Sequence, residues 1–239
     1  GATEVDGRGP SIWDAFAAVP GNIEDGSDGK VACDHYNRYQ EDVNIMSSMG
    51  VDAYRFSIAW PRIIPDGDGR IETRGLDFYD RLVAAMLAKN IAPWATLYHW
   101  DLPQALQARD NGWVSRKTVD AFVRYCRVVA ERLGDRVKNW ITHNEPWCAA
   151  VLGYGIGHHA PGHKSWAEAL PASHHLLLSH GRAVEVIRSE VPNAHVGITL
   201  NAASTEPASP SEHDKKACRL IDGEFNRWYL DALYRGRYP

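Results

Sequence analysis

The sequence is organised around one stretch, residues 139–147, which reads Asn139-Trp140-Ile141-Thr142-His143-Asn144-Glu145-Pro146-Trp147. It begins with an apolar, β-branched run that is typical of a short buried strand, and the proline stops that strand. The strand ends in a carboxylic acid beside an amide and between two tryptophans. A structural acid is more often found on a helix surface, where water solvates it, so this placement indicates a catalytic group.

Strands and helices alternate on both sides of this stretch. Besides the opening stretch, strands are predicted at 51–60, 91–100 and 195–201. Helices are predicted at 34–49, 74–89, 115–133, 174–190 and 214–234. Residues 1–30, apart from a short apolar piece at 12–16, and residues 146–171 are expected to be loops. Because single helices separate the strands, the strands must run parallel in an α/β fold.

The connections in this pattern are uneven, since those after the strands are much longer than those after the helices. Parallel sheets bind their ligands at the carboxyl ends of the strands. There the predicted strands end in Trp60, in residues 98–101 and in residues 143–147. Aromatic faces beside amide, imidazole and carboxylate groups suit a sugar, whose C–H faces stack on rings while its hydroxyls need polar partners.

Composition excludes several other classes of partner. The chain has 239 residues, 44% hydrophobic and 23% charged, which is typical of a globular protein of one large domain or two small ones. A net charge of −4 and the lack of a Lys or Arg run argue against nucleic acid and membrane surfaces as partners. The four cysteines form no Cys-x-x-Cys pair, so we expect free thiols in a reducing compartment, the cytoplasm.

Metal and nucleophile chemistry finds little support in the motifs. Residues 143–145 match the His-x-Glu of zinc deaminases, but the Pro-Cys-x-x-Cys that completes that signature is absent. Three loop histidines, His158, His159 and His163, lack a second ligand cluster and are better explained as surface or hydrogen-bonding residues. Residues 174–175 are interpreted as a helix start. No Gly-x-Ser-x-Gly elbow, dinucleotide fingerprint or phosphate loop occurs, so no metal and no cofactor are expected.

Residues 142–146, Thr-His-Asn-Glu-Pro, resemble the Thr-x-Asn-Glu-Pro acid/base motif of family 1 glycoside hydrolases, the retaining β-glucosidases and their relatives. Four further matches follow in the family's order, at 6–14 (its N-terminal signature), 54–62 (second barrel strand), 97–103 (third strand) and 153–162 (the loop after the fourth). The resemblance covers nearly the whole chain and implies a (β/α)8 TIM barrel.

The resemblance also implies a role for each matching residue near the reacting bond. Glu145 would be the general acid that protonates the glycosidic oxygen and then the base that activates water. Asn144 would donate a hydrogen bond to the sugar's 2-hydroxyl. Arg55 would lie beneath the site and keep the nucleophile ionised, with a structural ion pair at the barrel bottom as the alternative.

Other matching residues would contact the two halves of the substrate. The resemblance implies that His99 and Trp100 hold the glycone, and that Trp147, Leu152 and His159 line the aglycone entrance. The implied reaction is hydrolysis of terminal β-D-glucosyl residues, from cellobiose or from aryl and alkyl β-glucosides, by double displacement.

The same comparison shows what these residues lack. Retention needs a second carboxylate about 5–5.5 Å from the first, and the family's Ile/Val-Thr-Glu-Asn-Gly nucleophile segment does not occur here. Residues 1–239 are therefore expected to form one partial catalytic domain with barrel strands two to five, the first strand and strands six to eight being absent. Two hypotheses follow: a β-glucosidase whose remaining barrel half, in a longer chain or a second fragment, supplies the nucleophile, or an inactive half-barrel that only binds sugar or complements another fragment.

Overall fold

The computed structural model describes residues 2–239 and contains one parallel sheet in the strand order β1-β2-β3-β4. Its strands are β1 (Ala53–Ser57), β2 (Ala92–Tyr98), β3 (Asn139–Asn144) and β4 (His195–Thr199). Each strand pairs with the next one along the chain, and all three pairings are parallel. The predicted parallel α/β arrangement is confirmed.

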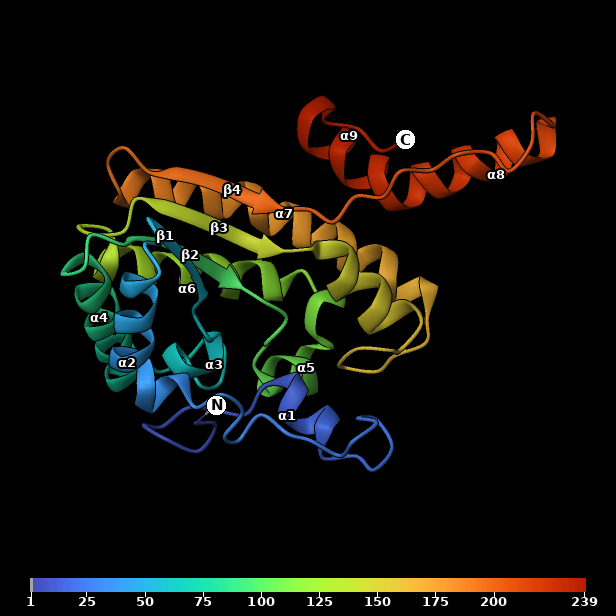
Figure 1. Cartoon of the computed structure of the whole chain (residues 1–239). Helices are drawn as coiled ribbons and strands as arrows, with labels where there is room; N and C mark the ends of the chain where they lie inside the picture. Colours follow the sequence, from blue (N-terminus) through green and yellow to red (C-terminus); the bar gives the residue numbers. More distant parts are fainter. Residues whose placement is uncertain (1) are drawn as a thin grey trace.

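Helices cover one face of this sheet. The main ones are α2 (His35–Ser48), α4 (Thr73–Leu87), α6 (Lys117–Leu133) and α7 (Trp166–Glu190). Of these, α4, α6 and α7 lie side by side along the outer face of the curved sheet (Figure 1). On the opposite face of β1 the side chains of Arg55 and Ser57 are exposed. The result is a single curved wall whose helix-free side carries Arg55 and Ser57 of β1.

Aromatic rings fill the space between the sheet and its helices, and Trp60 is one of them. The prediction that Trp60 ends a strand at the binding edge is wrong, because β1 stops at Ser57 and Trp60 begins the short helix α3 (Trp60–Ile63). Pro61, at the first turn, favours that helix start. The fully buried Trp60 ring stacks on Tyr125 at 5.2 Å, and its Nε1 donates to the Gly67 carbonyl at 3.0 Å.

Several short helices lie outside the predicted helices, and the last of them falls in the stretch 146–171 that was predicted as loop. These are α1 (Ile12–Ala17), α5 (Gln104–Asp110), the 3-10 turn η1 (Gly112–Val114) and the π-helix η2 (Cys148–Gly155). Ser11 and Asp14 start α1 with a reciprocal capping box. A helix of six residues is too short for the periodicity of its apolar residues to predict it.

The helix predicted from residue 174 begins at Trp166 instead, so α7 contains Pro171. The proline removes one backbone hydrogen bond of the helix. Burial of Ala169, Ala172 and Leu176 along the same face offsets that loss. Residues 174–175 therefore lie inside the helix and not at its start.

The predicted helix 214–234 is divided in three. It consists of α8 (Glu212–Asp222), the π-helix η3 (Gly223–Arg227) and α9 (Trp228–Arg235). Figure 1 shows α8 projecting away from the sheet while α9 returns toward α7. Within residues 2–239, no helix is long and apolar enough to cross a membrane.

Candidate active site

A chain of side-chain hydrogen bonds crosses the carboxyl ends of β1, β2 and β3. Arg55 of β1 donates through Nε to Thr96 Oγ1 on β2 at 2.9 Å and through Nη2 to Asn144 Oδ1 on β3 at 2.6 Å. Asn144 in turn donates through Nδ2 to Glu145 Oε2 at 3.1 Å. The structure thus links three predicted site residues, Arg55, Asn144 and Glu145, directly to one another. Thr96, which was not predicted, orients Arg55 from β2.

The backbone at Glu145 departs from the strand in a way that aims its side chain. The register of β3 against β4 shifts between Ile141 and Asn144, a local irregularity of the kind that re-aims side chains near binding sites. Glu145 then takes φ +46° while its N–H donates to the Thr199 carbonyl at 2.8 Å. Trp100, at the end of β2, has φ +75°. Left-handed backbone at two residues with side chains is strained and concentrates at functional sites.

The two oxygens of Glu145 have different surroundings. Oε2 accepts the Asn144 amide and also lies 3.7 Å from the Cys148 thiol. Burial, followed by the neighbouring Glu145, raises the pKa of Cys148 to about 12, so the thiol keeps its proton at neutral pH. No hydrogen bond from any residue within 2–239 reaches Oε1. The carboxyl group is therefore held through one oxygen, and the other is available to a ligand.

Aromatic rings gather beside Asn144 on the side of β2. Trp100 donates through Nε1 to the Asn144 carbonyl at 2.8 Å, which fixes the ring against β3. Its ring centroid lies 5.2 Å from that of His99 and 5.0 Å from that of His159. Trp13, which was not predicted as a site residue, lies 5.3 Å from His159 on the other side.

Both histidines in this group stay neutral at physiological pH. Partial burial, followed by the charge of Arg55, lowers the pKa of His99, and burial lowers the pKa of His159. A neutral imidazole has one donor and one acceptor, which is the pattern needed to bind hydroxyl groups.

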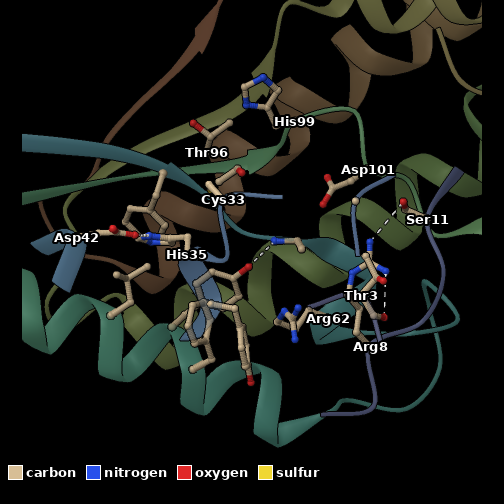
Figure 2. Close-up of a pocket in the computed structure, with 18 of the residues that line it drawn as sticks. Thr3, Arg8, Ser11, Cys33, His35, Asp42, Arg62, Thr96, His99 and Asp101 are labelled. Atoms are coloured by element: carbon tan, nitrogen blue, oxygen red, sulfur yellow. Dashed lines mark hydrogen bonds and ion pairs between the residues drawn. The ribbon is translucent and has the colours of Figure 1, made fainter. Parts of the chain in front are cut away.

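A cavity of about 1010 Å³ continues from His99 and Arg55 toward the N-terminal segment (Figure 2). Glu145 is not among its lining residues, so the cavity extends the polar edge away from the carboxyl group. Asp101 lines it near Arg8. Burial raises the pKa of Asp101 to about 6, and the charge of Arg8 opposes that rise.

The opposite side of Glu145 is formed by Trp147 and by residues distant in sequence. Trp147 donates through Nε1 to Glu224 Oε1 at 2.7 Å, and its ring centroid lies 4.6 Å from that of Phe225. Leu152, on η2, is linked to His159 through the backbone, where the His159 N–H donates to the Leu152 carbonyl at 3.0 Å. Sequence reasoning missed Glu224 and Phe225 because they lie within a helical run, and nothing local marks them as site residues.

Two further histidines, His143 and His163, have structural partners. His143 is fully buried, stacks on Phe122 at 4.5 Å and lies 2.8 Å through Nε2 from Ser179 Oγ. His163 contacts Glu168 at 2.8 Å, in agreement with its interpretation as a hydrogen-bonding residue. In the described part of the chain, no group of three or more His, Cys, Asp or Glu side chains could hold a metal ion.

Known proteins match this chain over its whole length. The family model for glycosyl hydrolase family 1 matches residues 1–239. Beta-glucosidase A of Thermotoga maritima is 50% identical over 241 residues, and the beta-glucosidase of an Agrobacterium species is 52% identical over 239 residues. Both matches cover all of this chain. They cover 54% of the Thermotoga maritima protein and 52% of the Agrobacterium protein.

A solved structure gives the same result. The beta-glucosidase from Thermotoga maritima in complex with deoxynojirimycin superimposes with a TM-score of 0.97 at 50% identity, covering all of this chain and 54% of that one. The predicted fold class, a wall of a (β/α)8 barrel, is confirmed by this likeness. The chain spans about half the length of the relatives it matches. On the evidence of its motifs, its sheet and these matches, the chain is a member of glycosyl hydrolase family 1.

Proposed function

We propose that this chain is the acid/base half of a retaining β-glucosidase, and that Glu145 is its general acid and base. The observation that carries the proposal is the asymmetric support of the Glu145 carboxyl group. Oε2 is held by Asn144 and Cys148 while Oε1 faces no partner among the described residues. A proton donor to a glycosidic oxygen needs this combination of fixed position and one accessible oxygen. The relatives that support the proposal are named beta-glucosidases.

The neighbouring groups fit the binding of a glucosyl ring. Trp100 offers an aromatic face fixed by its bond to the Asn144 carbonyl, and the neutral His99 offers a donor and an acceptor for hydroxyls. Asn144 Nδ2 lies beside Glu145, where it can also donate to the 2-hydroxyl. Trp147, Leu152 and His159 are proposed to line the leaving-group side. The printed titles of solved relatives, with deoxynojirimycin or the substrate analog salicin bound, support this substrate class.

Arg55 is proposed to serve the second carboxylate of the reaction. Its guanidinium is oriented by Thr96 and Asn144 and faces the concave side of the sheet. A fixed positive charge there would favour the ionised form of a nearby nucleophile. That nucleophile, with the first strand and strands six to eight, is proposed to come from the remaining half of the barrel, so that residues 1–239 form part of a single catalytic domain.

Two finer assignments belong to the same proposal. The substrates are proposed to include cellobiose, which would place the enzyme in cellulose breakdown and carbohydrate metabolism. A cytoplasmic location is supported by the four cysteines, all of which are free thiols. Cell fractionation with an antibody against residues 1–239 tests the location.

Glu145→Gln in protein that carries both barrel halves tests the main proposal. Loss of the general acid should lower kcat/KM for 4-nitrophenyl β-glucoside by about 10²- to 10⁴-fold. With 2,4-dinitrophenyl β-glucoside, whose leaving group needs no proton, azide should restore part of the turnover. Glu131→Gln, on the exposed surface of α6, is the matched control and should leave the rate unchanged. Unchanged turnover in Glu145→Gln contradicts the assignment. Glucose binding without hydrolysis in the parent protein supports the sugar-binding remnant instead.

A further inference from the structure

The η3 segment makes the leaving-group side of the site depend on residues about eighty positions from the acid/base motif. Glu224 accepts the Trp147 indole N–H at 2.7 Å, and Phe225 packs against the same ring with its plane inclined by 56°. Two adjacent residues of one element thus contact both the polar edge and the face of one tryptophan. Together they determine where the plane of that ring lies.

The backbone at both contacts is unusual. Within residues 2–239 the two π-helical segments are η2, which begins immediately after Trp147, and η3, which contacts it. A π segment adds one residue to a helical turn, and such segments occur often at functional sites. The extra residue changes the direction of the side chains that follow relative to those of α8. Glu224 and Phe225, the second and third residues of η3, are the ones that contact Trp147.

Further hydrogen bonds hold η3 in place beside Trp147. Asn226 Nδ2 donates to the Ala203 carbonyl at 2.8 Å, and the Ala203 N–H donates back to Asn226 Oδ1 at 3.1 Å. Arg227 Nε donates to Asp222 at 2.6 Å across the segment. The Asn226 bonds tie η3 to the loop that follows β4, and the Arg227 bond ties it to the end of α8.

We propose that η3 determines leaving-group specificity, with Glu224 as a positioning residue that fixes the plane of the Trp147 ring and Phe225 as its packing support. This inference rests on the proposed function and deepens it. A fixed indole presents a flat face two residues from Glu145, and flat aromatic groups gain more from such a face than short alkyl chains do. The class of substrate selected is therefore aryl β-glucosides over alkyl β-glucosides.

The test compares steady-state kinetics of four variants in protein that carries both barrel halves. Glu224→Leu removes the acceptor and should raise KM for 4-nitrophenyl β-glucoside about tenfold, while KM for methyl β-glucoside changes less than about twofold. Glu224→Gln keeps an acceptor oxygen and should stay within about twofold of the parent for both substrates. Phe225→Leu should raise the aryl KM about threefold. Glu212→Gln removes an exposed carboxylate of α8 that pairs with Lys215, and it should change neither KM.

Two outcomes would overturn the inference. One is an equal rise of KM for the aryl and the methyl glucoside in Glu224→Leu, which indicates a general structural role. The other is equal behaviour of Glu224→Leu and Glu224→Gln, which shows that the hydrogen bond to Trp147 does not matter. Failure of the proposed function looks different, because then the parent protein itself does not hydrolyse 2,4-dinitrophenyl β-glucoside.

Discussion

Acid should weaken this fold through a histidine that lies behind the candidate site. His180 lies on α7, with Nδ1 2.7 Å from the Thr142 hydroxyl on β3, three residues before Glu145. Burial, followed by the positive charge of Arg188, lowers the pKa of His180 from 6.5 to about 4. The folded protein therefore resists a proton that the unfolded chain accepts. Protonation of His180 therefore costs free energy in the folded state.

The sign and size of the effect follow from that difference. Because the folded pKa is depressed, the stability it represents is present above about pH 6.5 and is lost as the pH falls toward about 4. The lowering of the His180 pKa from 6.5 to about 4 corresponds to a loss of about 3 kcal/mol of unfolding free energy over this pH range. Burial also lowers the pKa of His143, which adds a loss in the same direction.

Urea unfolding at pH 7.5 and pH 4, followed by tryptophan fluorescence, measures this loss. His180→Gln replaces the imidazole with a polar group that does not titrate, so the parent should lose about 3 kcal/mol more than this variant between the two pH values. Arg188→Gln removes the second cause of the shift and should reduce the loss in the parent background. Equal losses in the parent and in His180→Gln would refute the reasoning, because His180 would then bind protons equally in both states.

Two further predictions concern a thiol and a glycine. Burial raises the pKa of Cys148 to about 12. Iodoacetamide at pH 8 should therefore alkylate this thiol at least about a hundred times more slowly than the exposed Cys33. Peptide mass spectrometry measures both alkylation rates, and comparable rates would show that the Cys148 thiol is not enclosed. Gly75→Ala would place a Cβ 2.1 Å from the Arg62 carbonyl oxygen and should lower the unfolding free energy by about 1–3 kcal/mol. Gly181→Ala, on the open surface of α7, is the control and should leave the unfolding free energy unchanged or raise it by up to about 1 kcal/mol. Similar changes of the unfolding free energy for the two variants in a urea titration would contradict the clash.

Local patterns were sufficient for the framework of this protein. The apolar run before Glu145, the alternation of strands and helices and the uneven connections predicted a parallel sheet with its site at the carboxyl ends. Asn144 and Glu145 are adjacent in sequence, so the motif alone placed both residues at the end of this strand. The five motifs in their order indicated the family that the comparisons then showed.

Other features depended on contacts that no local pattern encodes. Trp60 looked like a binding residue at a strand end, yet Pro61 starts a helix there and Tyr125, from α6, covers the ring. Pro171 looked like a helix boundary, yet tertiary burial keeps it inside α7. In each case the free energy gained by burying side chains outweighed the conformational preference of the local sequence.

The sequence by itself determined which residue types stand at the end of β3, because side-chain type and strand position are local properties. Only the tertiary structure decided what surrounds them. It brought Arg55 to Asn144 across 89 positions and Glu224 to Trp147 across 77. Such pairs form because parallel strands align their carboxyl ends and because a π-helical residue redirects a helix face, and both depend on the packed arrangement of distant elements.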